Sequence, residues 1–322
     1  MTEAAIAIIG AGQLGSRHLQ ALALLQQPAK IFLVDPVTEP LDRALERWKE
    51  VGGHSRISTF CDISSLPTTL DIAIIATASV SRRMVIETLL DHATVRFLVL
   101  EKFLFPRAAD YAAIQDLLDI RAVPAWVNCP RRMIPAYRDI QKTISGSVQM
   151  SVTGSAWGLA CNSVHWLDLF SWLTGAPPDW LHTSLEPEIV DSKRRGFVEF
   201  NGTISAGGPG SSGLQITSYA SGSHPLDVVI STATHRFIIR ESVCSCLVST
   251  KDNGWISDPI PFQMMPQSRL THLVVEELIS SGTCTLTPYV ESSKLHLQLL
   301  EPFLANYNSA SNTPENLQCP IT

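Results

Sequence analysis

The sequence predicts an α/β protein of two domains: an N-terminal domain with a doubly wound parallel sheet, then an α+β domain with a mostly antiparallel open sheet. In the first part of the chain, short apolar runs alternate with longer amphipathic segments, as strands and helices do in a doubly wound sheet. In the second part, strand-like segments follow one another with short turn-rich connections, which favours antiparallel pairing. We therefore expect domains at 1–127 and 128–322.

The strands expected in the first domain are short, rich in Ile, Val and Leu, and apolar on both faces. This pattern is typical of parallel strands that are covered by helices on both sides. They are expected at 4–10, 30–35, 70–77, 96–102 and 122–128. The amphipathic segments that follow the first four of these strands predict helices at 13–27, 39–51, 80–92 and 107–120.

In the second domain, a connecting helix is expected first and two helices last. The residues on alternate positions of 147–157 are apolar, which predicts a half-buried strand. Further strands are expected at 181–190, 196–206, 213–221, 225–233 and 235–242. The three helices are expected at 130–144, 268–282 and 290–308.

The composition excludes several classes of protein. Hydrophobic residues make up 45% of the chain and the formal net charge is -6 without a block of like charges, so we expect an ordered protein that binds neither nucleic acid nor a membrane. The N-terminus lacks the pattern of a signal peptide. The seven cysteines are scattered and complete no zinc pattern, which predicts reduced thiols, no metal site and a cytoplasmic location.

A glycine-rich turn follows the first expected strand and opens a helix, in the sequence Gly10-Ala-Gly12-Gln-Leu-Gly15. An acidic residue lies about 20 residues further on, at the end of the second strand. This spacing is the fingerprint of a dinucleotide-binding Rossmann domain, in which the helix N-terminus holds the pyrophosphate and the acid binds the ribose. The acid would repel a 2′-phosphate, so NAD is favoured over NADP. The residues expected to contact the cofactor here are Gly10, Gly12, Gln13, Leu14, Gly15 and Asp35.

Two further segments carry candidate catalytic groups. Glu101 and Lys102 follow the fourth expected strand, where ligands bind in open α/β sheets. The apolar segment 161–175 places Cys161, His165 and Asp168 at helical spacing. By itself the histidine is better explained by a buried core position, whereas its combination with Lys102, the glycine turn and the domain order favours an active site.

The order of these motifs resembles one enzyme family. The turn at 10–15, the Ala-Thr-Ala-Ser segment at 76–79, the Glu-Lys pair at 101–102 and His-x-x-Asp at 165–168 recur together in the glucose–fructose oxidoreductase, inositol dehydrogenase and rhizopine-catabolism (Gfo/Idh/MocA) family. The resemblance implies that Lys102 contacts the reacting oxygen of the substrate and that His165 is, or supports, the acid–base group. It also implies that Thr77, Glu101 and Lys102 lie at the cofactor.

The chain departs from the family pattern at three places. Phe103 replaces the usual proline after the Glu-Lys pair, and Ala78-Ser79 replaces a Pro-Asn pair. Cys161 stands where the family often has an aspartate, which puts the usual proton relay in doubt. The expected substrate-binding residues are Asn162, Arg131, Arg132 and Asp168. The arginines could read an anionic group of the substrate or could only orient the crossing between the domains, and Asp168 could instead orient His165.

We therefore expect an NAD(P)-dependent dehydrogenase or reductase, with NAD favoured, that acts on a secondary alcohol or ketone of a sugar, a cyclitol or a (nucleotide-)sugar derivative, in carbohydrate metabolism. Oxidation requires a group that takes the hydroxyl proton, and histidine titrates near working pH. A non-catalytic regulator that responds to dinucleotides remains open, as does an enzyme that uses NAD transiently for glycoside cleavage or lyase chemistry. The open sheet also predicts a homodimer or homotetramer.

Overall fold

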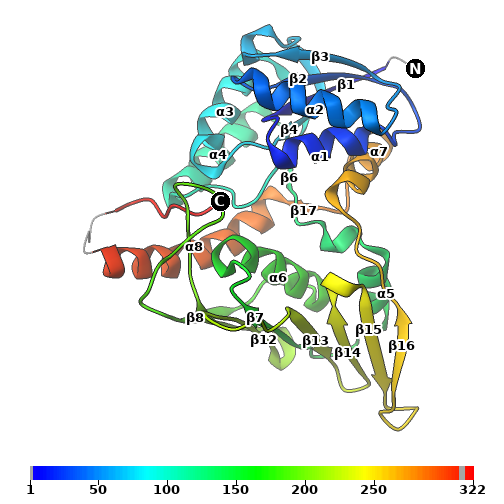
Figure 1. The fold of residues 1–322 in the computed structure, drawn as a ribbon, viewed down its shortest axis with the longest axis vertical. Coiled ribbons are helices and arrows are strands. Elements are labelled where there is room, and N and C mark those ends of the chain that lie inside the picture. Colours follow the sequence, from blue (N-terminus) through cyan, green and yellow to red (C-terminus); the bar gives the residue numbers. More distant parts are fainter. Residues whose placement is uncertain (1–2, 312–315) are drawn as a thin grey trace.

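The computed structural model describes residues 3–311 and 316–322 and contains two large sheets with helices around and between them (Figure 1). The first sheet has the order β17-β6-β5-β4-β1-β2-β3 and is parallel apart from β17. This confirms the predicted α/β class with a doubly wound sheet, and the switch in strand order lies between β1 and β4. The strands are β1 (Ala4–Ile9), β2 (Ala29–Val34), β3 (Arg56–Phe60), β4 (Thr69–Ile75), β5 (Thr94–Leu100), β6 (Ala125–Val127) and β17 (Thr287–Pro288).

The strands of this sheet are buried on both faces because helices cover each side. Ile6 and Ile8 of β1 pack in one apolar cluster with α1, α2 and α7, whereas Ala7 and Ile9 pack in another with α3 and α4. Successive side chains of a strand point to opposite faces, so a strand covered on both sides must be apolar throughout. The helices are α1 (Gln13–Leu22), α2 (Thr38–Glu50), α3 (Ser79–His92), α4 (Ala108–Arg121) and α7 (Thr271–Ser281).

The chain returns to the first sheet after it has built the second. Strand β17 pairs with β6, and α7 packs against α1. The first domain therefore includes β17 and α7, which lie beyond residue 127. A boundary at residue 127 does not separate the two parts of the molecule. The expected elements did not include β3, whose exposed and half-buried residues lack the apolar pattern of the inner strands.

The second sheet has eight strands in the order β16-β15-β14-β13-β7-β12-β11-β8. Its neighbouring strands are antiparallel except for β7 and β12, which confirms the expected mostly antiparallel sheet. Its strands are β7 (Gln149–Ser155), β8 (Trp180–Leu185), β11 (Gly202–Gly208), β12 (Ser212–Tyr219), β13 (Asp227–Ser231), β14 (His235–Arg240), β15 (Ser245–Thr250) and β16 (Ser257–Pro261). A separate hairpin pairs β9 (Val190–Asp191) with β10 (Val198–Glu199).

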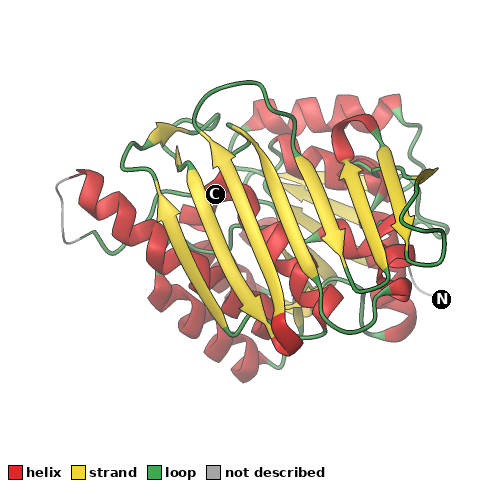
Figure 2. Ribbon diagram, turned by 90° about the horizontal axis from the view of Figure 1, so that it is seen from below, coloured by secondary structure: helices red, strands yellow, loops and turns green. Residues whose placement is uncertain are grey.

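One face of the second sheet is open, and helices lie behind the other (Figure 2). Apolar side chains of β7 and β12, such as Val152 and Ile216, pack in one cluster with Trp166 and Phe170 of α6 (Leu159–Thr174). Because α6 lies between this sheet and the first domain, it brings its N-terminal turn to the junction of the two parts. The remaining helices are α5 (Pro135–Thr143) and α8 (Tyr289–Ser311).

The last described segment, 316–322, lies against both parts of the molecule. Cys319 N donates to the carbonyl of Pro106, and Val198 N donates to the carbonyl of Pro320. Cys319 and Ile321 are fully buried, so this segment is packed into the junction. Within the described residues, no helix combines the length and the apolar character that crossing a bilayer requires.

Candidate active site

The three glycines of the turn after β1 have different surroundings. A Cβ atom on Gly15 would lie 1.7 Å from the carbonyl oxygen of Gly10, and Gly10 itself has a φ of +100°. Gly12 is the N-cap of α1, and a Cβ there would meet nothing within 4 Å. The turn is therefore closed on the protein side and open at the helix N-terminus, as a pyrophosphate site requires.

Asp35 lies at the end of β2 with its carboxylate turned to this glycine turn. Its Oδ2 accepts a hydrogen bond from Ala11 N at 2.8 Å, and its Oδ1 accepts one from Val37 N at 3.0 Å. A cavity of about 330 Å³ lies beside it and is also lined by Gly10 and Thr77. The hydroxyl oxygen of Thr77 is buried and has no hydrogen-bond partner among the described residues. These features fit the adenosine side of a dinucleotide.

Gln13 and Leu14 continue the turn into the first residues of α1. Gln13 is exposed, and its side-chain oxygen accepts a hydrogen bond from Arg47 of α2 at 2.9 Å. Leu14 is half-buried. Both residues lie next to the open space at Gly12, where their predicted contact with the cofactor remains a prediction.

The carboxylate of Glu101 is buried and hydrogen-bonded within the protein. It is 3% exposed, and its carboxylate accepts hydrogen bonds from His18 Nε2 at 2.8 Å and from the side-chain amide of Asn128. Burial raises the pKa of Glu101, but the hydrogen bonds from His18 and Asn128 outweigh it, so the pKa lies below its ordinary value. Its predicted contact with the cofactor therefore has no geometric support, and its carboxylate instead ties β5 to α1 and β6.

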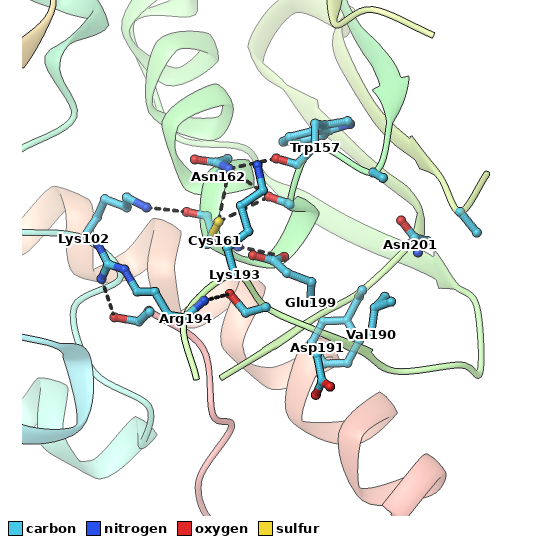
Figure 3. Close-up of a pocket in the computed structure, with 16 residues that line it drawn as sticks. Lys102, Trp157, Cys161, Asn162, Val190, Asp191, Lys193, Arg194, Glu199 and Asn201 are labelled. Atoms are coloured by element: carbon cyan, nitrogen blue, oxygen red, sulfur yellow. Dashed lines mark hydrogen bonds between the residues drawn. The ribbon is translucent and has the colours of Figure 1, made fainter. Parts of the chain in front are cut away.

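Lys102 reaches the second domain. Its Nζ donates to the carbonyl oxygen of Cys161 at 2.9 Å. Both residues line a cavity of about 350 Å³ to which the two domains contribute (Figure 3). The cavity lies at the carboxyl end of β5, where open parallel sheets bind ligands. Its polar and charged lining residues are Lys102, Asn162, Asp191, Ser192, Lys193, Arg194, Glu199, Asn201 and Thr322.

The first turn of α6 forms one wall of the cavity. Gly158 is the N-cap with a φ of +83°, and Asn162 Nδ2 donates to the carbonyls of Trp157 and Gly158 at 3.1 Å. Asn162 therefore lines the cavity, as its predicted role in substrate binding requires. Burial raises the pKa of the Cys161 thiol to about 12, so this side chain adds no negative charge to the site.

A carboxylate that the sequence analysis missed lies against the same turn. Glu199 of β10 accepts hydrogen bonds on its Oε2 from Ala160 N at 2.8 Å and from Cys161 N at 3.4 Å. Burial raises the pKa of Glu199 despite a hydrogen bond with the Cys161 side chain, these two backbone bonds and the positive charge of Lys102. No motif marks this residue, because it is one acidic position in an expected strand and lies 38 residues from Cys161.

His165 lies one turn further along α6 and does not line this cavity. Its Nδ1 is buried and has no partner among the described residues. Burial, followed by the charges of Lys102 and Arg131, lowers the pKa of His165 well below its ordinary value. The ionisation near neutrality that the sequence analysis expected is therefore not expected at this ring, although its role in the reaction remains a prediction.

The two arginines and Asp168 lie in ion pairs outside the cavity. Arg131 donates two hydrogen bonds to Glu241, at 2.9 and 2.8 Å, and its guanidinium lies 3.7 Å above the ring of Trp166. Arg132 binds both oxygens of the fully buried Asp168 at 2.9 Å. These contacts hold the crossing between the domains against α6. The predicted substrate contacts of these three residues have no geometric support.

Comparison with known proteins identifies the first domain. The family described as "Oxidoreductase family, NAD-binding Rossmann fold" (GFO_IDH_MocA) matches residues 4–129, which include the glycine turn, Asp35, Thr77 and Lys102. Residues 4–129 belong to the Gfo/Idh/MocA oxidoreductase family. No curated protein sequence matches the chain.

Solved structures share the fold of this chain over nearly its whole length. UDP-N-acetylglucosamine 3-dehydrogenase GnnA from Acidithiobacillus ferrooxidans has a TM-score of 0.70 at 16% identity, covering 95% of this chain and 98% of that one. An oxidoreductase from Agrobacterium radiobacter, in complex with NAD+, L-tartaric acid and magnesium, has a TM-score of 0.71 at 18% identity, covering 97% of each. A super-repressor mutant of Gal80p from Saccharomyces cerevisiae has a TM-score of 0.74 at 13% identity, covering 97% and 96%. Enzymes and a regulator thus share this fold.

The Arg132–Asp168 pair predicts a large loss of stability in Asp168→Asn. This change leaves a buried guanidinium without its counter-charge, which typically costs about 3–5 kcal/mol. Urea denaturation measures the free energy of unfolding. The control Asp42→Asn, at an exposed position of α2, should change it by less than about 0.5 kcal/mol. A loss below about 1 kcal/mol in Asp168→Asn would contradict the assigned role.

The geometry of the glycine turn predicts that alanine at Gly15 lowers stability, whereas alanine at Gly12 weakens cofactor binding. Gly15→Ala should lower the free energy of unfolding by about 1–3 kcal/mol, because its Cβ collides with Gly10. Gly12→Ala should leave stability nearly unchanged but weaken NADH binding about tenfold or more, equivalent to about 1.4 kcal/mol. Melting curves and NADH fluorescence titrations measure the two effects. Equal loss of stability in both variants would show that Gly12 serves packing.

Proposed function

We propose that the protein transfers hydride between NAD and a secondary alcohol or ketone of a sugar, cyclitol or nucleotide-sugar derivative. The observation that carries this proposal is the position of Lys102, which stands at the carboxyl edge of a dinucleotide-binding sheet and projects into a cavity walled by the second domain. The oxidoreductase-family Rossmann domain supports it.

The cofactor site fits NAD. The open space at Gly12 and the N-terminus of α1 would hold the pyrophosphate, and the free lone pairs of the Asp35 carboxylate would accept bonds from the ribose hydroxyls. The unpartnered hydroxyl of Thr77 would bind the edge of the cofactor. NAD, when bound, supplies the carbon that exchanges the hydride with the substrate.

Lys102 would act on the reacting oxygen. As the substrate hydroxyl becomes a carbonyl, negative charge develops on its oxygen, and a fixed ammonium stabilises that charge more strongly in a partly dry cavity than in water. The bond from Lys102 to the Cys161 carbonyl holds the ammonium at the cavity wall. In the reducing direction the same group stabilises the alkoxide that forms from the carbonyl.

The lining of the cavity suits a polyhydroxylated substrate with an anionic substituent. Asn162 would offer its amide oxygen and Asn201 its amide nitrogen to hydroxyls, because the nitrogen of Asn162 and the oxygen of Asn201 are already bonded within the protein. Lys193 and Arg194 bring positive charge from the segment between β9 and β10. Both basic side chains are exposed, so they would bind a phosphate at the rim rather than in the interior. This supports a sugar phosphate or nucleotide sugar as the substrate class.

A regulator that binds NAD without turnover is the second candidate. It is favoured by Cys161, whose neutral thiol stands where the family often has an aspartate, and by the shared fold of Gal80p. An enzyme that uses NAD transiently would show reduced cofactor during the reaction without net consumption. Absorbance of reduced nicotinamide during and after the reaction separates these candidates.

The open face of the second sheet is the surface on which we propose that a second copy packs, in a homodimer or homotetramer. Trp180, which is 48% exposed, lies on β8 at an edge of this sheet. Large exposed sheet faces are commonly covered in assemblies. Light scattering of the purified protein gives the oligomeric state.

The function is tested by mixing the purified protein with NAD+ and, in turn, D-glucose, myo-inositol and UDP-N-acetylglucosamine, and by recording the absorbance of NADH. NADH binding is measured in parallel by fluorescence. The proposal expects turnover of at least one compound. Binding of NADH without turnover of any of them would favour the regulator.

The assignment of Lys102 predicts that Lys102→Met lowers kcat by about 10²-fold or more and leaves NADH affinity within about twofold, because the ammonium acts on the substrate oxygen. Steady-state kinetics and fluorescence titration measure the two quantities. The control Lys142→Met, on the exposed side of α5, should change neither. Loss of NADH binding together with turnover in Lys102→Met would make Lys102 a cofactor or structural residue.

The carboxylate of Asp35 predicts that NADH binds about tenfold more tightly than NADPH, because a 2′-phosphate would meet its negative charge. Asp35→Ser should reduce this preference. Asp62→Ser, at an exposed position of the same cavity, should preserve it. Calorimetry that gives equal or tighter NADPH binding to the native protein would refute the cofactor assignment.

A further inference from the structure

We propose that Glu199 is the group that exchanges a proton with the reacting hydroxyl of the substrate. This inference rests on the proposed hydride-transfer function and assigns its proton. In the oxidative direction, the O–H bond breaks and its proton bonds to a carboxylate oxygen of Glu199. The electron pair of the O–H bond forms the carbonyl, and the hydrogen on carbon leaves with the pair of the C–H bond as hydride, which NAD would accept when bound. Glu199 then releases the proton to water.

The position of Glu199 carries the proposal. Lys102 and Glu199 reach the first turn of α6 from different elements, and both line the cavity (Figure 3). Lys102 binds the carbonyl of Cys161, and Glu199 binds the amide of the same residue. A hydroxyl placed between them would meet an ammonium that stabilises oxygen charge and a carboxylate that takes a proton.

One oxygen of this carboxylate remains on the cavity side. Both backbone hydrogen bonds end on Oε2, whereas Oε1 lies toward Gly158, since a Cβ on that glycine would approach Oε1 to 3.1 Å. Gly158 itself lines the cavity. The two amides therefore hold Oε2, and the neutral thiol of Cys161 is a further hydrogen-bond partner of the carboxylate, which leaves acceptor capacity on Oε1 for the substrate hydroxyl.

The other titratable groups of the region are less suited to this step. The Cys161 thiol holds its proton because its pKa is raised to about 12, and Asp191 is exposed at the rim. His165 lies outside the cavity lining, and its lowered pKa makes it a weak base. The charged and titratable groups that face Glu199 or share its cavity are Lys102, Cys161, Asp191, Lys193 and Arg194.

Burial makes the Glu199 carboxylate a stronger base, as the proton transfer requires. An ordinary glutamate is too weak a base at neutral pH, and desolvation raises the pKa of Glu199 above its ordinary value. The ionised form accepts the proton, so the oxidative rate should fall as the pH drops through this raised pKa.

A purely structural role is the competing explanation, because a carboxylate that accepts two amides at a helix N-terminus also caps the helix. Glu199→Gln separates the two roles. Glutamine keeps an oxygen that accepts the amides of Ala160 and Cys161, but it cannot exchange a proton. Because burial of the ionised form is unfavourable, Glu199→Gln should melt no lower than the native protein at neutral pH.

The experiment measures kcat against pH for the native protein, Glu199→Gln, Glu199→Ala, His165→Asn and the control Glu188→Gln, an exposed position outside the cavity, with whichever of the three test compounds the native protein oxidises. We expect Glu199→Gln to lower kcat by about 10²-fold or more and to abolish the decrease of kcat at low pH. Glu188→Gln should retain both the rate, within about twofold, and the decrease of kcat at low pH, and His165→Asn should retain that decrease. NADH affinity should be unchanged in Glu199→Gln.

An independent readout needs no turnover. Infrared difference spectra of protein labelled with ¹³C-glutamate should show a protonated carboxyl band that titrates above the ordinary glutamate range and is missing in Glu199→Gln. Native kinetics in Glu199→Gln, with a lower melting temperature only in Glu199→Ala, would make Glu199 a helix cap and overturn the proposal. If only His165→Asn abolishes the decrease of kcat at low pH, the proposal is overturned and His165 is the proton-exchanging group. If the native protein binds NADH and oxidises none of the compounds, the proposed function fails, and this inference fails with it.

Discussion

The position of α6 decides where the site forms, and the buried ion pair between Arg132 and Asp168 fixes that position. The pair joins the crossing between the two parts of the chain to the middle of α6, and Thr287 of β17 also donates to Asp168. Three segments that are distant in sequence thus meet at one carboxylate. With α6 held there, its first turn faces the carboxyl edge of the parallel sheet.

The two halves of the site are built by different physical means. On the cofactor side, small residues and free backbone groups leave space at Gly12 while the turn stays closed at Gly15. On the substrate side, charges from three elements surround one helical turn: Lys102 follows β5, Glu199 lies on β10, and Arg194 lies between β9 and β10. The burial that raises the pKa of Glu199 also keeps Cys161 neutral, so the carboxylate is the basic group beside the ammonium.

The sequence predicted what depends on local pattern. Apolar runs located the inner strands, and the glycine spacing located the turn and Asp35 correctly, because both follow from backbone geometry within one β-α-β unit. Glu199 could not be found in this way, since it reaches Cys161 only through the packing of a short hairpin against α6. For Arg132 and Asp168 the sequence left a substrate contact and an orienting role open, because only the fold shows that each neutralises the other. Strand β17 is too short to give a pattern.

The most direct test of the central claim, that the cavity beside Lys102 is a hydride-transfer site, is the fate of a substrate deuterium. The protein is incubated with NAD+ and with D-glucose, myo-inositol and UDP-N-acetylglucosamine deuterated at their ring carbons, and the recovered cofactor is analysed by mass spectrometry. We expect NADH that carries one deuterium with at least one compound. Recovery of NAD+ without deuterium from all three, by a protein that binds the cofactor, would contradict the assignment and leave a dinucleotide-binding regulator.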